Sequence, residues 1–147
     1  MKEKRVPTDK IWVVLDTNVL VSALLTSNPL SPPVQIVKFL YKGIIKPLYS
    51  EFILEEYKEV LYRKRFNFDP NIVNELIDSI KSLGFNIINP IKTDEKFTDS
   101  DDIIFYEVKL SVDDSFLVTG NTKHFPKKHF VVTPFEMISI LRNKKLI

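Results

Sequence analysis

Four separated stretches of the chain carry acidic or amide side chains next to apolar segments. The first, Asp16-Thr17-Asn18, interrupts the otherwise apolar run over residues 11–25. A carboxylate buried there without a partner would be strongly destabilising or would take up a proton. Asp16 has a structural role if it is only the N-cap of a following helix, and a chemical role if other acids reach the same place.

The second stretch is EFILEEYKEVLYRKRF, which predicts a helix that Ser50 caps and that ends near Phe66. At 100° per residue, its apolar side chains share one face. They are Phe52, Ile53, Leu54, Tyr57, Val60 and Leu61. Glu56 falls on the edge of that face, about 80° from its centre, whereas Glu55 and Glu59 point away. Glu56 is therefore the acid that reaches inward, unless it is a boundary glutamate paired with a lysine.

The third stretch, TDSDDIIFYEVKL, places Asp99, Asp101 and Asp102 at the start of a predicted helix, where acids suit the helix dipole. This helix is apolar on nearly every side, so we expect its N-terminus to lie against the core. Asp102, immediately before the apolar run, is best placed to face Asp16, with Asp101 and Asp99 in reserve. The structural alternative is that all three acids cap the helix.

The fourth stretch, LVTGNTKHFP over residues 117–126, is a buried strand that ends in Thr119, Gly120 and Asn121. A turn would explain these residues alone, but they also bring a hydroxyl and an amide oxygen to the sheet edge. Carboxylates gathered there need a counter-charge, because like charges raise one another's pKa. With no cysteine and only two histidines, an oxygen cluster suits Mg²⁺ or Mn²⁺, and the chemistry implied is phosphodiester hydrolysis.

Strands alternate with helices among the elements that must position these groups. The expected strands are residues 11–15, 45–49, 85–89, 115–119 and 130–132. The expected helices are residues 19–25, 34–42, 51–66, 70–83, 99–110 and 134–142, with a proline-rich loop over 26–33. This alternation predicts a three-layer α/β/α fold with a central, mainly parallel sheet of about five strands, in one domain spanning residues 1–147. Ligands bind at the C-terminal strand ends of such sheets, where Asp16 lies.

The composition is that of an ordinary globular protein, with 44% hydrophobic and 27% charged residues and a net charge of +2. The lack of cysteine excludes disulfide scaffolds, thiol nucleophiles and cysteine-ligated zinc. The N-terminal MKEKRVPTDK is too polar for a signal peptide, and no apolar run approaches the roughly 20 residues that span a bilayer. We therefore expect a cytoplasmic protein with no membrane association.

Taken together, the four stretches resemble the PIN domain family, and more narrowly the PIN domains that form the toxin component of bacterial and archaeal toxin–antitoxin systems. LDTNVLVSALL resembles the opening motif of the family, and SEFILEEYKEVLYRKRF its helix with the second acid. DSDDIIF resembles the third-acid motif, and LVTGNTKHFP the segment near the fourth. Single motifs of this kind are weak, but four in the right order are fairly specific.

The resemblance implies a PIN-like fold and an endoribonuclease that depends on Mg²⁺ or Mn²⁺. It implies that Asp16, Glu56 and Asp102 are the metal-binding, catalytic acids. Asn18 and Thr119 would be supporting polar groups beside them. The implied partners are an RNA substrate, a cognate antitoxin protein and a second copy of the chain in a homodimer.

The chain departs from the family pattern at two places. Many PIN domains have Asp where this chain has Asn121, which we keep among the catalytic residues because an amide can still ligate through oxygen or position a water. It brings no charge, so a second metal would bind more weakly. Val108 and Lys109 stand where the family usually has small residues. Asp99 is kept as a further supporting polar group.

Basic residues border two of the four stretches, and a basic rim around an acidic centre would hold a phosphate backbone. The candidate RNA-binding residues are Arg63, Lys64, Lys123, His124 and Lys127. The alternative is that these side chains are merely solvated.

Two other enzyme families fail on particular residues. A haloacid-dehalogenase-like phosphatase needs a second Asp two residues after Asp16, where Asn18 stands. A response-regulator receiver domain needs an acceptor Asp at the end of a middle strand, and FNIINP offers none. A catalytically weak PIN-like module for RNA binding or assembly is the remaining alternative, and Asn121 favours it.

Overall fold

The computed structural model describes residues 6–7 and 9–147. The N-terminal segment MKEKRVPTDK is judged from its sequence to be too polar for a signal peptide. Residues 1–5 and 8 of this segment lie outside the described residues. No helix in the described part of the chain has both the length and the apolar character needed to cross a membrane.

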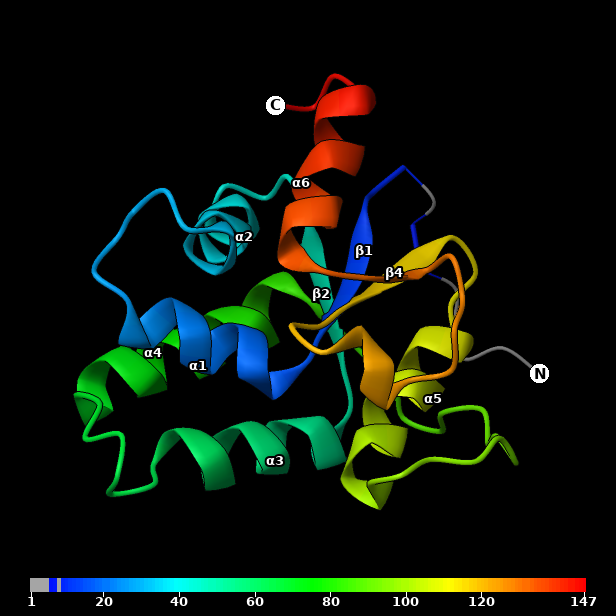
Figure 1. Ribbon diagram of the computed structural model, residues 1–147, viewed down its shortest axis with the longest axis horizontal. Helices are drawn as coiled ribbons and strands as arrows, with labels where there is room; N and C mark the ends of the chain where they lie inside the picture. The colour runs from blue at the N-terminus through cyan, green and yellow to red at the C-terminus, as the bar shows by residue number, and fades with distance from the viewer. Residues whose placement is uncertain (1–5, 8) are drawn as a thin grey trace.

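Five parallel strands form the central sheet, in the order β3-β2-β1-β4-β5 (Figure 1). The strands are β1 (Trp12–Leu15), β2 (Lys46–Tyr49), β3 (Phe85–Asn86), β4 (Ser115–Val118) and β5 (Val131–Val132). The central strand β1 is buried along its whole length, which explains its continuous apolar sequence.

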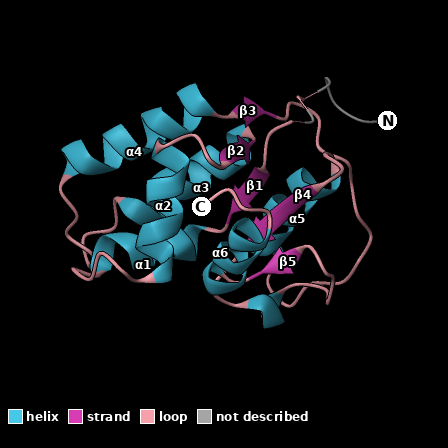
Figure 2. Cartoon of the chain, turned by 90° about the horizontal axis from the view of Figure 1, so that it is seen from above, coloured by secondary structure: helices cyan, strands magenta, loops and turns pink. Residues whose placement is uncertain are grey.

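Within the described residues, six α-helices accompany this sheet. They are α1 (Thr17–Leu25), α2 (Pro32–Tyr41), α3 (Glu51–Leu61), α4 (Pro70–Leu83), α5 (Ile103–Leu110) and α6 (Pro134–Asn143). Helix α5 packs against β1, β2 and β4 on one face, and α2 and α6 pack together on the other side (Figure 2). The predicted three-layer α/β/α fold with a mainly parallel sheet is therefore confirmed.

Helix starts follow the capping chemistry of the sequence. Ser50 caps α3 through its hydroxyl, and Asp69 caps α4 just before Pro70. Thr133 and Glu136 form the predicted capping box of α6. Because the cap at Ser50 follows β2 directly, it begins α3 at the carboxyl edge of the sheet.

Three predicted boundaries are wrong. Helix α3 ends at Leu61 rather than near Phe66, and the chain then reverses through Asn67, which has a positive φ of 53°. The strand expected over 85–89 shortens to two residues, because only these pair with β2. Helix α2 begins at Pro32, inside the expected loop, since proline fits the first helical turn where the N–H has no partner.

Two further differences concern the acid-bearing segments. The helix expected over 99–110 divides into a 3-10 helix, η1 (Ser100–Asp102), followed by α5. Phe52, assigned to the apolar face of α3, is 63% exposed. It lies five residues before the buried Tyr57, about 140° away around the helix, so it cannot share that face.

Lys109 is accommodated inside the protein rather than at its surface. The side chain is buried, and its Nζ lies 4.3 Å from the centre of the Phe130 ring. The same Nζ donates to the Val112 carbonyl at 3.3 Å. These contacts stabilise the buried ammonium group.

Candidate metal centre

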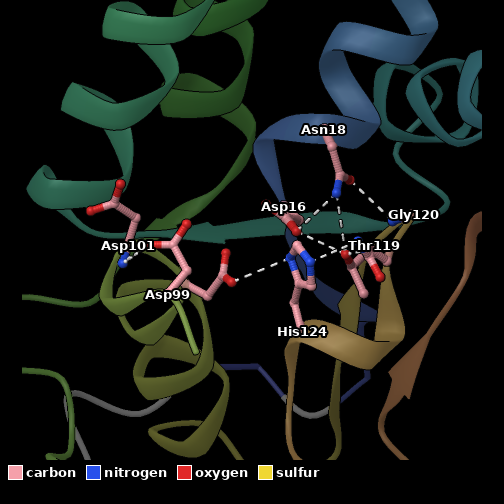
Figure 3. A network of polar contacts seen from close by, with 9 residues as sticks. Asp16, Asn18, Asp99, Asp101, Thr119, Gly120 and His124 are labelled. Carbon is pink, nitrogen blue, oxygen red and sulfur yellow. Dashed lines mark hydrogen bonds and ion pairs between the residues drawn. The ribbon is translucent and has the colours of Figure 1, made fainter. Parts of the chain in front are cut away.

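The carboxyl ends of β1 and β4 meet where the strand order of the sheet reverses. Leu15 pairs with Val118, and the chain leaves the two strands at Asp16 and Thr119. The Asp16 N–H also donates to the Val118 carbonyl at 2.9 Å. Figure 3 shows the side chains of Asp16 and Thr119 turned toward each other at this point, which is where open parallel sheets bind ligands.

Three polar groups hold the end of β1 against the end of β4. Oδ2 of Asp16 accepts from the Thr119 hydroxyl at 2.8 Å and from the Asn18 amide at 3.2 Å. The Asn18 Oδ1 in turn accepts from the Gly120 N–H at 3.0 Å. Asp16 occupies the N-cap position of α1, but its side chain makes no capping hydrogen bond. The side chains of Thr119 and Asn18 therefore orient its carboxylate, and the backbone N–H groups of Thr17 and Asn18 lie close enough to lower its pKa.

Burial raises the pKa of Asp16, which is only 7% exposed. The hydrogen bond from Thr119 opposes this rise by stabilising the charged form. Tyr57 lies close by, fully buried, and its hydroxyl donates to the Leu15 carbonyl at 2.6 Å. Burial and the charge of Asp16 raise the pKa of Tyr57, so it remains a neutral donor.

Asp102 supplies the second inward-facing acid. Its Oδ2 is buried and has no hydrogen-bond partner among the described residues, and Nδ1 of His124 lies 3.6 Å from it. Burial, followed by the charges of Asp16 and Asp99, raises the pKa of Asp102 to about 6. A buried carboxylate oxygen without a partner is rare, because it keeps the full penalty of desolvation.

Glu56 stands at the edge of this cluster and is partly buried, whereas Glu55 and Glu59 are exposed. Burial, followed by the charges of Asp101 and Glu59, raises the pKa of Glu56, and Asp16 adds to the rise. The charge of Asp16 therefore acts on Glu56, although its effect is smaller than that of burial.

The two reserve acids are exposed. Asp99 caps η1 by accepting from the Asp101 N–H at 2.9 Å. The structural alternative of helix capping therefore holds for Asp99. Asp101 is a peripheral charge near Glu56.

Asn121 and His124 form the remaining side of the cluster. The Asn121 side-chain nitrogen lies 2.9 Å from Nε2 of His124, and its backbone N–H donates to the Thr119 hydroxyl at 3.0 Å. His124 thereby has one ring nitrogen toward Asn121 and the other toward Asp102. Its charge, when present, lowers the pKa of both Asp16 and Asp102.

The donor chemistry of these residues suits a hard cation. Among the described residues, no three acidic, histidine or cysteine side chains are gathered closely enough to hold one ion by themselves. However, Mg²⁺ keeps several waters and is commonly bound through one or two carboxylates. The buried carboxylate of Asp16 fits such an ion, and so does the Asp102 oxygen that has no hydrogen-bond partner among the described residues. Glu56 fits as a more distant acid.

The basic residues selected from the sequence are exposed and fall into two groups. Arg63 follows α3, where its guanidinium pairs with Glu59 at 2.7 Å and lowers the pKa of Glu56. Lys64 is next to it in the turn. Lys123 and Lys127 lie in the segment after Asn121 and have no ion-pair partner among the described residues.

Sequence reasoning placed His124 in the basic rim and missed its position beside Asp102. The spacing from Asn121 to His124 is the available signal, since residues three apart lie on one side of a 3-10 turn. Tyr57 was assigned to the core, where it lies, but its hydroxyl contact at the end of β1 has no signature in the sequence.

Comparisons with known proteins point in one direction. A family model described as the PIN domain matches residues 12–123, which is more than half of the chain. The match spans Asp16, Glu56, Asp102 and Asn121. No curated protein and no solved structure matches the chain.

Proposed function

The chain belongs to the PIN domain family, whose members are in general nucleases, and from that premise we propose that it is a divalent-metal-dependent endoribonuclease. The observation that carries the proposal is the meeting of Asp16 and Asp102 at the switch point of the sheet. Asp102 presents there a buried oxygen without a hydrogen-bond partner among the described residues, and the charge of Asp16 raises the pKa of both Asp102 and Glu56. A cation at this point would give the Asp102 oxygen a partner and would supply a counter-charge for the acids.

Asp16 and Asp102 would hold Mg²⁺ or Mn²⁺, with Glu56 as the third acid. A bound ion of this type neutralises charge on a phosphodiester and lowers the pKa of a coordinated water. Thr119 and Asn18 orient the Asp16 carboxylate, and hydrogen bonds donated to it favour its ionised form against the effect of burial. Burial and the neighbouring acids raise the pKa of Glu56, so this carboxylate is a better proton acceptor than a solvated glutamate.

The exposed basic residues suit RNA as the substrate. Arg63 and Lys64 follow α3, and Lys123 and Lys127 follow Asn121, so positive charge flanks the acids on two sides. Such charges attract the phosphate backbone without reading its sequence.

Cleavage of a 5′-labelled single-stranded RNA tests the proposal. We expect the wild-type chain to cut in Mn²⁺ or Mg²⁺ and to stop in EDTA. Asp16→Asn should not cut, while Asp78→Asn, the same substitution on the exposed face of α4, should cut like wild type. Equal background from wild type and Asp16→Asn would contradict the proposal.

A second candidate is a catalytically weak RNA-binding or assembly module. Asn121 favours it, because this neutral side chain interacts with His124 and adds no charge to the cluster. RNA binding by the wild-type chain in Mn²⁺ without any cleavage would favour this candidate over the nuclease.

We also propose that the chain is the toxin of a toxin–antitoxin pair, acts in the cytoplasm and forms a homodimer. A mainly apolar cleft of about 250 Å³, lined in part by Leu24, Val37 and Ile72, supports binding of a protein partner. Light scattering of the purified chain tests the homodimer. Inhibition of cleavage by the product of a neighbouring reading frame tests the antitoxin.

A further inference from the structure

A cleft of about 490 Å³ opens in the segment that follows Asn121. Three lysines stand around it, namely Lys123, Lys127 and Lys128. Apolar side chains form its floor, namely Phe125, Pro126 and Val131. The volume lies in the range of small-ligand sites. The apolar floor and the lysines at the rim distinguish this cleft from the acidic cluster around Asp16 and Asp102.

The cleft and the acidic centre share one wall, the 3-10 helix η2 (Thr122–His124). Nδ1 of His124 lies 3.6 Å from Oδ2 of Asp102, while Lys123 and Thr122 line the cleft. Successive residues of a 3-10 turn point in different directions, so one short element serves both sites. A ligand in the cleft would therefore lie beside the acids.

Two of the three lysines around the cleft have no ion-pair partner among the described residues. Lys128 pairs with Glu95 at 3.6 Å, and the Tyr106 hydroxyl holds that glutamate at 2.5 Å. Lys123 and Lys127 are exposed and have no ion-pair partner among the residues described. Two free ammonium groups at the mouth of a cleft attract a phosphate.

The floor offers a fixed apolar surface. Phe125 is 6% exposed and packs edge-on against Phe97, with ring centres 6.1 Å apart. Glu136 lies at the rim, and its Oε1 accepts from the Thr133 N–H at 2.8 Å. Its other oxygen is left as an acceptor for an N–H group. The cleft therefore offers an apolar floor for a base, an acceptor for an N–H group of that base, and two lysines, Lys123 and Lys127, for a phosphate.

We propose that this cleft binds one nucleotide of a single-stranded RNA substrate next to the scissile bond, with the base on the apolar floor and a phosphate at Lys123 and Lys127. The inference rests on the proposed ribonuclease function. The strand is single because a base in a duplex is paired and stacked, so its face cannot reach the floor.

Binding without cleavage tests the proposal on the full chain. Fluorescence anisotropy in EDTA would follow an end-labelled eight-nucleotide RNA binding to wild type and to Lys123→Ala/Lys127→Ala. We expect the double variant to bind about tenfold or more weakly, and the slope of log affinity against log salt to fall by about 1.4, as for two lost phosphate contacts on a single strand.

Lys42→Ala/Lys144→Ala is the matched control, because it removes the same charge from exposed lysines in the C-cap positions of α2 and α6. It should change neither quantity by more than twofold. An equal loss in both double variants would overturn the proposal, since it would show only the effect of net charge.

The base contact has its own measurement. An abasic RNA of the same length should bind at least fivefold more weakly to wild type, and the same RNA in a duplex should also bind more weakly. Equal binding of the abasic strand, or tighter binding of the duplex, would overturn the nucleotide assignment.

The outcome of these binding tests can be distinguished from the outcome of the cleavage test of the nuclease proposal. RNA that binds in the predicted pattern but is not cut in Mn²⁺ would leave the cleft assignment standing and remove the proposed function. Cleavage by wild type together with unchanged RNA binding by Lys123→Ala/Lys127→Ala would support the proposed function and overturn the cleft assignment.

Discussion

The Thr119 hydroxyl donates a hydrogen bond to Oδ2 of Asp16 at 2.8 Å, joining residues 103 positions apart in the sequence. The bond ties the end of β4 to the end of β1. It also fixes the direction of a carboxylate that burial would otherwise drive toward protonation. This single contact therefore links the stability of the sheet edge to the charge state of the candidate metal centre.

Thr119→Val keeps the shape of the side chain and removes this hydrogen bond, together with the acceptor of the Asn121 N–H. We expect a loss of about 1.5–3 kcal/mol in the free energy of unfolding, because a buried charged acceptor loses its donor. Thr17→Val is the control, since the buried Thr17 hydroxyl has no hydrogen-bond partner in the structure. It should change stability by no more than about 0.5 kcal/mol, or stabilise. Urea unfolding measures both, and equal losses would contradict the role given to Thr119.

The raised pKa of Asp102 predicts how the free energy of unfolding depends on pH. Its pKa rises from 3.8 to about 6 on folding, so between these values the folded chain binds more protons than the unfolded chain. Stability from this group is therefore fully present below about pH 4 and is lost as the pH rises through about 6. The loss is of the order of 1–3 kcal/mol.

Asp102→Asn should remove most of this dependence and raise the melting temperature at pH 8 in EDTA by at least about 2 °C. Asp101→Asn, at an exposed neighbour, is the matched control and should leave the profile close to that of wild type. A metal-free wild-type chain that becomes more stable between pH 4 and 7 would sink this prediction.

Glu56 and Glu55 make a natural pair on α3, because Glu56 is partly buried and Glu55 is exposed. Glu56→Gln should lower the rate of RNA cleavage at least about 100-fold, as expected for loss of an acid at a metal-dependent centre. Glu55→Gln should cleave at the wild-type rate. Similar cleavage rates for the two variants would contradict a role for Glu56 in the metal centre.

Asn121→Asp adds the fourth acid that many PIN domains carry. Each added carboxylate strengthens binding of a hard cation, so the Mn²⁺ affinity measured by calorimetry should rise about tenfold. In EDTA the same variant should be less stable than wild type, because a further negative charge joins Asp16 and Asp102. Asn121→Ala, which adds no charge, should show neither effect.

Much of this centre was predictable from the sequence because single residues mark strand ends. An acid directly after an apolar strand placed Asp16, and helical phase separated Glu56 from Glu55. The same phase, applied to Phe52, would have shown that it lies away from the buried face. Boundaries were less predictable, since the two-residue length of β3 depends on pairing with β2.

The contact between His124 and Asp102 could not be predicted from the sequence, for a different reason. Whether a histidine in a basic loop faces solvent or an acid depends on the path of η2 across the sheet edge. That path is set by tertiary pairing, including the bond between the Thr119 N–H and the Val132 carbonyl at 2.9 Å. No local pattern in NTKHFP contains this information.

Anomalous diffraction from crystals grown in Mn²⁺ is the most direct measurement of where a cation sits on this chain. The account predicts a manganese peak touching the carboxyl groups at positions 16 and 102, absent from crystals of Asp16→Asn. A peak elsewhere, or none at this edge of the sheet under saturating Mn²⁺, would contradict it.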